Sequence, residues 1–391
     1  MNKLRLLAVC LLATFIMSGL VTPIGLLTAS AAEGYAVEIT LIASQFSFFI
    51  GGVFIGYIIS FFVFDYFKMK TIITSCYVIA IISIAAIHYH VSFTLLPYLL
   101  IVLGICASIV VCAGGTLITR IWQGKKRQSV LVAQDAMFNG GGVIFAYVAT
   151  YFVGNSYVWS ATYMVVAGFF LSVVVLAVMS NFDTGEEKQP EDSQAEIKTE
   201  WNIEFILIGI SLMLFLMAKI SIFIWAPQFV EQKFTVSSEQ SGQLMSNIFM
   251  SAFIGSVAGT YIVSKINVKY LLYSLVILAI VTTWLFTQSP SMKSILLLGL
   301  VFGISISATY NSYVAYGLTF VGSPTHKHIA YLLLVGGLGS SLAPVMSSKA
   351  VAISGDVNSA IVMCTLTFLA GFLSLLSANI ANTIKLKGKT N

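Results

Sequence analysis

The chain has 391 residues, of which 58% are hydrophobic and only 9% are charged. A soluble globular chain carries about 25% charged residues, so this sequence has too few polar groups to cover a water-facing surface of its size. The composition therefore excludes a soluble globular protein and predicts one embedded in the lipid bilayer. The net charge of +5 does not indicate a nucleic-acid partner, because the basic residues lie in short loops between apolar runs.

The apolar residues come in runs of roughly 20, the length at which an α-helix crosses a bilayer. The runs are continuously apolar rather than alternating, which excludes a transmembrane β-barrel. We therefore predict an all-α membrane protein with twelve transmembrane helices. The first six spans cover residues 5–30, 39–64, 71–88, 94–119, 129–153 and 158–180. The second six cover residues 203–228, 241–264, 270–288, 294–319, 329–353 and 359–383.

The first apolar run could also be a signal peptide, because Lys3 and Arg5 precede it and the small residues 29–32 end it. However, the run from Leu6 to Ser30 is too long for a typical signal core. Its removal would also leave an odd number of spans. We therefore predict that this run forms the first transmembrane helix.

One long polar connection divides the chain into two halves. Residues 182–201 hold seven acidic residues, two lysines and a proline, which indicates a soluble linker. We predict a six-helix bundle at residues 1–181, a cytoplasmic acidic linker at 182–201 and a second six-helix bundle at 202–391.

The two halves show a weak internal repeat. The Leu-Gly-Ile of residues 103–105 in the fourth span matches the Phe-Gly-Ile of residues 302–304 in the tenth. The first and seventh spans each carry a proline near the outer end, Pro23 and Pro227. Two six-span halves in parallel repeat are typical of transporters that bind their substrate between the halves, near the middle of the membrane.

The distribution of Lys and Arg predicts the orientation of the chain. Of the 20 basic residues, 16 fall on the side that holds both termini and the linker, 3 fall on the opposite side, and Lys219 lies inside a span. Short cytoplasmic loops carry the excess of Lys and Arg. We therefore predict a multi-pass protein of the bacterial inner membrane with both termini in the cytoplasm.

Several stretches resemble the major facilitator superfamily. The loop Asp65-Tyr66-Phe67-Lys68-Met69-Lys70 keeps the acid and the trailing base of the loop signature of that family, while the central glycine and the first arginine are absent. The stretch of residues 115–138 resembles the TsgA branch of the family, near the fucose-permease group. Residues 225–227 and 246–251 are similar to the same branch.

The resemblance implies a major facilitator fold and a secondary transporter that moves a small polar solute by alternating access, with protons as candidate coupling ions. It further implies that spans one, four, seven and ten line a central cavity, and that spans five and eight meet between the halves. Asp65, Lys68, Lys70 and Arg120 would form the gating signature. We expect a monomer in the lipid bilayer. The rival is a non-transporting membrane sensor or receptor on the same fold.

Two ionisable residues lie well inside predicted spans, where a charge costs a few kcal/mol or more. Asp135 lies roughly 12 Å into the fifth span at the rise of an α-helix. It is either a carboxylate that titrates or lines the cavity, or a structural ion-pair partner of Arg120. Lys219 in the seventh span is either a cavity cation for an anionic or zwitterionic substrate or a snorkelling side chain. Their depths differ by roughly 15 Å, so we predict no static pair between them.

Further substrate-binding candidates lie near Lys219 or on polar stripes of the spans. For any one stripe, the alternative is close packing between helices. The candidates are Ser18 and Thr22 in the first span, Phe215, Phe223 and Trp225 in the seventh, Asn247 in the eighth and Asn311 in the tenth.

The sequence contains no phosphate-binding loop, no metal-ligand cluster and no catalytic triad, so we predict no enzymatic activity, no cofactor and no metal. The five cysteines lie inside apolar runs and are expected to fill the core. The four histidines fall in predicted loops, where we expect them to be solvated rather than part of a span: His88, His90, His326 and His328.

Overall fold

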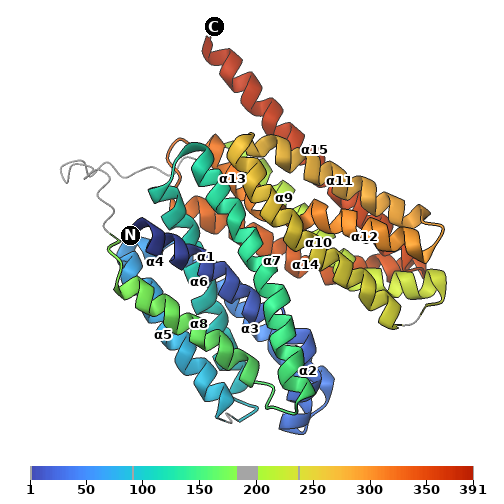
Figure 1. Ribbon diagram of the computed structural model, residues 1–391. Helices are drawn as coiled ribbons and strands as arrows, with labels where there is room; N and C mark the ends of the chain where they lie inside the picture. Colours follow the sequence, from blue (N-terminus) through green and yellow to red (C-terminus); the bar gives the residue numbers. More distant parts are fainter. Residues whose placement is uncertain (1, 90–91, 183–200, 237, 391) are drawn as a thin grey trace. The chain divides into compact units, whose positions relative to one another are not determined.

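The computed structural model describes residues 2–89, 92–182, 201–236 and 238–390 (Figure 1). Most of the predicted linker, residues 183–200, lies outside the described part of the chain. Within that part the regular structure is helical. The first half contains α1 (Asn2–Val21), α2 (Ile24–Tyr35), α3 (Ile39–Ser60), α4 (Val63–Tyr66), α5 (Met69–His88), α6 (Leu96–Ile121), α7 (Gly124–Gly154) and α8 (Ala161–Val178). The second half contains α9 (Ile203–Phe234), α10 (Ser238–Lys265), α11 (Val268–Gln288), α12 (Met292–Ser307), α13 (Thr309–Gly317), the 3-10 helix η1 (Leu318–Phe320), α14 (His326–Ser354) and α15 (Asn358–Thr390).

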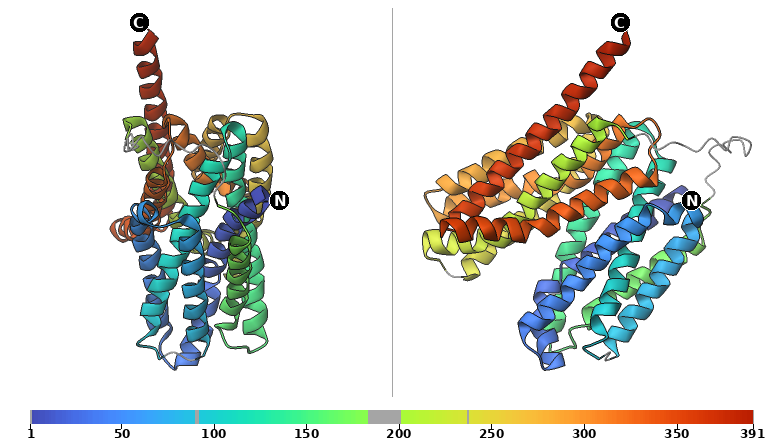
Figure 2. Two further views of the ribbon diagram at one scale, coloured as in Figure 1. Left: turned by 90° about the vertical axis from the view of Figure 1, so that its left-hand side faces the viewer. Right: turned by 180° about the vertical axis from the view of Figure 1, so that it is seen from behind.

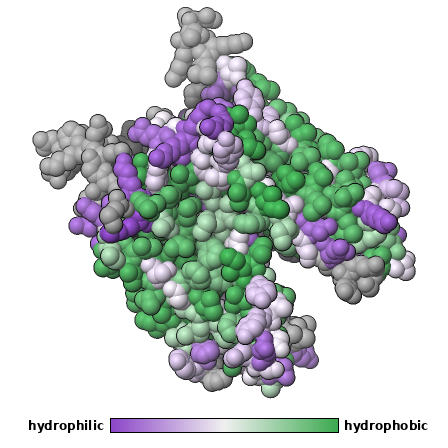
Figure 3. Space-filling model, viewed as in Figure 1, coloured by the Kyte–Doolittle hydropathy of each residue, from purple (hydrophilic) through white to green (hydrophobic). Residues whose placement is uncertain are grey.

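The prediction of twelve transmembrane helices is confirmed. Among the described residues, eleven helical segments are long and apolar enough to cross a bilayer, and the second span contains the shorter apolar segment Gln45–Ser60. A bilayer offers the backbone no hydrogen bonds, and these helices satisfy most of their own N–H and C=O groups. Apolar side chains cover most of the visible flanks of the helices, and hydrophilic residues gather toward their ends (Figure 3).

The chain forms two compact units that exchange two short segments. Unit 1 consists of Met1–Gln123, Met137–Thr199 and Thr325–Tyr331, and unit 2 consists of Gly124–Ala136, Glu200–Pro324 and Leu332–Asn391. The exchanged segments hold the first turns of α7 and α14: Gly124–Ala136 of α7 belongs to unit 2, and Thr325–Tyr331 at the start of α14 belongs to unit 1. These helices are the fifth and the eleventh spans, which are equivalent in the internal repeat.

Each unit is a bundle of helices that lie side by side. In unit 1, α3 lies along α6, while α1 and α5 contact both α6 and α8 (Figure 2). In unit 2, α9 lies along α15 and α10 lies along α12. Helix α15 continues to Thr390, and its last turns extend beyond the other helices of its unit (Figure 2).

Glycines allow the closest of these helix pairs to approach. A Cβ atom on Gly52 of α3 would lie 2.2 Å from the Ile101 carbonyl oxygen of α6, and one on Gly104 of α6 would lie 2.2 Å from the Phe49 oxygen. In unit 2, a Cβ on Gly303 of α12 would lie 2.2 Å from the Ile248 oxygen of α10. Gly104 and Gly303 were matched in the internal repeat, and they serve the same contact in the two units.

Two spans are interrupted. The first breaks at Pro23, between α1 and α2, because proline lacks the N–H that continues a helical ladder. The tenth breaks at Ala308, between α12 and α13. Here hydroxyl groups bind backbone carbonyls around the break: Ser307 Oγ donates to Ile304 O at 2.7 Å, and Thr309 Oγ1 donates to Ser305 O at 2.7 Å. Such bonds allow an irregular segment to persist inside a membrane.

The contact of Gly52 with α6 gives a test of the fold with a matched control one residue away. Gly52→Ala should force α3 and α6 apart and lower the free energy of unfolding by about 1–3 kcal/mol. Gly51→Ala should not destabilise the protein, because nothing lies within 4 Å of its Cβ position. Thermal unfolding in detergent can be followed with a thiol-reactive dye, since the five free cysteines are buried and become accessible on unfolding. Equal unfolding midpoints for the two variants would contradict this packing.

Candidate functional site

The interrupted tenth span receives a carboxylate from another helix. The break at Ala308 leaves backbone N–H groups at the start of α13 without an acceptor inside the helix. Asp135 of α7 fills this position: its Oδ2 accepts the Asn311 backbone N–H at 2.9 Å, and its Oδ1 accepts the Asn311 side-chain Nδ2–H at 2.9 Å. Both side chains are buried, with 7% and 8% of their surface exposed. A negative charge is favourable at a helix N-terminus.

The start of α7 is fixed in unit 2 by further contacts. Ser129 Oγ donates to the Thr260 carbonyl of α10 at 3.0 Å, and Lys125 Nζ donates to the Lys265 carbonyl at the end of the same helix at 2.8 Å. These bonds hold the first turns of α7 against α10. They position Asp135, six residues after Ser129, beside α13.

Lys219 lies on the buried face of α9, near the same break. Helices α9 and α13 run antiparallel. Ile208 of α9 lies against Gly317 at the end of α13, and Phe215, further along α9, lies with its ring 5.7 Å from that of Tyr313, which is earlier in α13. The position one turn beyond Phe215 along α9 therefore lies beside the start of α13, next to the break at Ala308. Lys219 occupies that position.

This register places Lys219 beside the start of α13, the part of the helix that Asp135 contacts through Asn311. Within the described part of the chain no ion pair within 4 Å joins Asp135 to Lys219, and the Lys219 ammonium makes no hydrogen bond. Its recorded contact is with the Phe223 ring, whose centroid lies 5.7 Å from Nζ. We call Asp135, Asn311, Lys219 and Phe223 the Asp135 site.

Other predicted residues lie outside the Asp135 site. Phe215 is buried in the bundle against Tyr313 and Phe368, with ring centroids 5.7 and 5.0 Å away. Asn247 lies on α10, and its Nδ2 is 3.4 Å from the Leu296 carbonyl oxygen of α12. The indole nitrogen of Trp225 is buried without a hydrogen-bond partner among the described residues.

The candidates of the first span form a hydroxyl pair in unit 1. Ser18 Oγ and Thr22 Oγ1 lie 3.0 Å apart, and the Thr22 hydroxyl donates to the Ser18 carbonyl at 2.6 Å. They adjoin the break at Pro23, and Gly142 of α7 lies against both side chains. Arg120 also belongs to unit 1, and its predicted ion pair with Asp135 stays a prediction.

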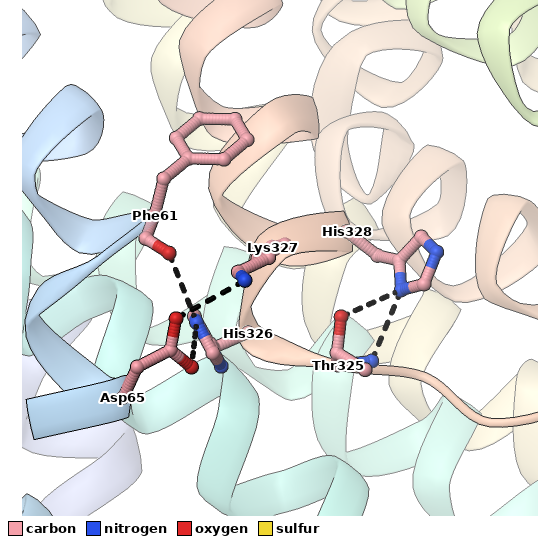
Figure 4. A network of polar contacts seen from close by, with 6 residues as sticks. All are labelled: Phe61, Asp65, Thr325, His326, Lys327 and His328. Atoms are coloured by element: carbon pink, nitrogen blue, oxygen red, sulfur yellow. Dashed lines mark hydrogen bonds and ion pairs between the residues drawn. The ribbon is translucent and has the colours of Figure 1, made fainter. Parts of the chain in front are cut away.

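A second polar cluster forms in unit 1 around the loop signature (Figure 4). Asp65 Oδ1 lies 3.3 Å from His326 Nε2, and Asp65 Oδ2 lies 3.1 Å from Lys327 Nζ. His326 Nε2 also lies 3.1 Å from the Phe61 carbonyl oxygen. We call Phe61, Asp65, His326 and Lys327 the Asp65 cluster. It attaches the first turn of α14, from the second half of the sequence, to the loop that follows the second span.

The prediction that the histidines are solvated in loops is wrong for two of them. His326 and His328 belong to the first turn of α14 and are buried, with 8% and 0% of their surface exposed. His328 Nδ1 accepts the Thr325 backbone N–H at 3.1 Å and lies 2.9 Å from the Thr325 hydroxyl, an arrangement that caps the helix. His88 ends α5 and contacts Ser160 at 3.1 Å. His90 lies outside the described residues.

The remaining members of the loop signature have separate roles in unit 1. Lys70 Nζ donates to the Val178 and Ser180 carbonyls at 2.8 and 3.1 Å, which neutralises the end of α8. Lys68 and Arg120 line an open pocket of about 320 Å³ together with Asp65. No group of three residues suited to hold a metal ion forms among the described side chains.

The family of the chain follows from comparison with known proteins. The family model of the Major Facilitator Superfamily matches residues 6–344. Two curated relatives, the TsgA homologues of Buchnera aphidicola subsp. Schizaphis graminum and Yersinia pseudotuberculosis serotype O:1b, are each 24% identical to this chain. The alignments cover 95% and 96% of this chain, and 96% and 95% of those relatives.

Solved structures share the fold. The E. coli fucose:proton symporter superposes with a TM-score of 0.78 at 13% identity, over 96% of this chain and 99% of that one. The human organic anion transporter MFSD10 gives a TM-score of 0.74 at 13% identity, over 96% of this chain and 100% of that one. Since the family match spans most of the twelve-helix chain, the protein belongs to the Major Facilitator Superfamily and is a secondary transporter rather than an enzyme.

Proposed function

We propose that this chain moves a small polar solute across the bacterial inner membrane by alternating access, and that Asp135 couples this movement to protons. The observation behind the proposal is the attachment of a buried carboxylate to an interrupted span. Asp135 holds the start of α13 through both of its oxygens. Protonation of Asp135 converts one oxygen from an acceptor into a donor and so changes this attachment.

The energetics favour such a role. Desolvation disfavours a charged carboxylate, while hydrogen bonds and a nearby cation favour it. A movement that changes the access of water to Asp135 would shift this balance and bind or release one proton. One solved fold neighbour is a fucose:proton symporter, so the fold is compatible with proton coupling.

The Asp65 cluster is suited to open and close once in each cycle. Helices α7 and α14 are continuous, yet the first turns of each belong to the other unit. Relative movement of the units must therefore bend these helices or release their first turns. The ion pair of Asp65 with Lys327 is partly exposed, and such pairs contribute little stability. The contact of Asp65 with His326 adds one polar contact to it. They can break at low cost.

Orientation gives the first test of the proposal. The distribution of basic residues favours cytoplasmic termini and a cytoplasmic linker. In a cysteine-free background, single cysteines in place of Ser92 and Ser193 should differ in their labelling. A membrane-impermeant reagent added to intact cells should modify position 92 alone, and permeabilised cells provide the control for position 193. Labelling at position 193 in intact cells would contradict the orientation.

Reconstitution into liposomes tests transport and coupling together. The wild-type protein should accumulate its solute when a proton gradient is imposed. Asp135→Asn removes the titration and nearly preserves the shape, so it should lose gradient-driven accumulation and retain exchange of solute down its own gradient. Ligand binding without any flux in the wild type would favour the sensor or receptor instead. Accumulation by Asp135→Asn equal to that of the wild type would remove Asp135 from the mechanism.

A further inference from the structure

The charge balance at the Asp135 site indicates the class of substrate. We propose that Lys219 binds the carboxylate of a monovalent organic anion and that this binding loads one proton onto Asp135, so that anion and proton cross the membrane together without net charge. The inference rests on the proposed function and adds the substrate class, the binding group and the stoichiometry.

The first observation is the state of the Lys219 ammonium. It carries three N–H donors, yet among the described residues it has no hydrogen-bond acceptor. The Phe223 ring at 5.7 Å stabilises the positive charge but accepts no conventional hydrogen bond. The side chain is partly buried on α9, where a cation without hydrogen-bond acceptors is costly. A ligand carboxylate would supply both the missing acceptors and the opposite charge.

The second observation is that Asp135 and Lys219 both lie beside the start of α13, although no ion pair joins them. Leu216 of α9 and Tyr310 of α13 both lie against Gly336, so the two helices are in register one turn before Lys219. This register places Lys219 beside the start of α13, where Asn311 holds the Asp135 carboxylate. The other charged group of this part of α7, Arg127, lies two turns earlier, about 12 Å along the helix. Two tyrosines of α13 are the titratable groups near this position: the hydroxyl of Tyr313 is bonded to Ser211 at 2.9 Å, and Tyr310 lies against Gly336.

The coupling follows from these two charges. Without substrate, the positive charge of Lys219 offsets the negative charge of Asp135. A carboxylate bound to Lys219 neutralises that cation and leaves Asp135 as an uncompensated buried anion, a state that desolvation disfavours. Asp135 then takes a proton from water onto a carboxylate oxygen. No covalent bond to the substrate forms or breaks, and departure of the anion reverses the step.

Asn311 is a positioning residue that suits both states of Asp135. Its side-chain Nδ2–H now donates to Oδ1 of the carboxylate. If Asp135 is protonated, rotation of the Asn311 amide presents a carbonyl oxygen that can accept the new O–H. A cationic side chain at this position would hold Asp135 in its charged form, because it has no acceptor.

The test measures proton uptake on ligand binding by the purified full-length protein in weakly buffered detergent solution with a pH indicator. The probes are acetate, glycolate, lactate and pyruvate, each compared with its neutral amide. Binding is measured by thermal shift and calorimetry, since a bound ligand stabilises the folded state. At least one carboxylate should bind with uptake of about one proton for each bound anion, while its amide should not bind. This ratio is measured on the wild type and does not depend on the folding of any variant.

Three variants identify the groups. Lys219→Met should weaken carboxylate binding roughly ten- to hundredfold, the loss expected when a charged hydrogen bond is removed. Lys219→Arg should retain binding. Asp135→Asn should bind the carboxylate without proton uptake. If Lys219→Met fails to fold, the ratio of protons taken up to anions bound by the wild type, together with carboxylate binding by Lys219→Arg, tests the proposal.

Several results would overturn the inference. These are binding of none of the four carboxylates, equal binding of a carboxylate and its amide, binding without proton uptake in the wild type, or unchanged affinity in Lys219→Met. Proton-driven accumulation of a neutral solute that requires Asp135 would overturn this inference and leave the proposed function intact. Absence of flux for every bound ligand would instead overturn the proposed function.

Discussion

The hydrogen bonds between the Asp135 carboxylate and Asn311 at the start of α13 are the interaction on which the proposed site depends. An interrupted span exposes backbone N–H groups inside a membrane, and a buried carboxylate needs donors, so each group satisfies the other. Because Asp135 belongs to α7 and Asn311 belongs to α13, the charge state of one side chain bears on the contact between two spans. A titratable group placed in this way can join proton binding to movement of a helix.

The helix pairs within each unit pack tightly, whereas the first turns of α7 and α14 are attached by polar contacts. Helices α3 and α6 in unit 1, and α10 and α12 in unit 2, touch backbone to backbone at glycines. Close-packed interiors transmit displacement rather than absorb it. By contrast, the first turns of α7 and α14 are held by a few polar bonds, such as Ser129 with Thr260 and Asp65 with Lys327. Movement of the units is therefore expected to concentrate at these first turns, one of which leads to Asp135.

The sequence was sufficient to predict the class of fold, the twelve spans and the two ionisable residues inside spans, because each depends on local composition. Asp135 and Lys219 are conspicuous as ionisable residues within apolar runs. The break at Ala308 was not predicted, because hydroxyl residues such as Ser307 and Thr309 suit close packing equally well until their acceptors are known. Nor was the attachment of the first turn of α7 predicted, since Ser129 and Thr260 are 131 residues apart. The prediction of solvated histidines was wrong because the eleventh span was predicted to begin at residue 329, whereas α14 begins at His326. Thr325 is a typical helix-capping residue ahead of an apolar run, and this signal places His326 and His328 in the first turn of the helix.

Infrared difference spectroscopy of the protonated carboxyl group tests the central claim most directly, because it needs no ligand. As the pH is lowered, the wild-type protein should develop a C=O stretching band that is missing in Asp135→Asn. The midpoint of this titration should lie at higher pH in Lys219→Met, because removal of the cation destabilises the charged carboxylate. A band that persists in Asp135→Asn, or a midpoint that does not respond to Lys219→Met, would contradict the account.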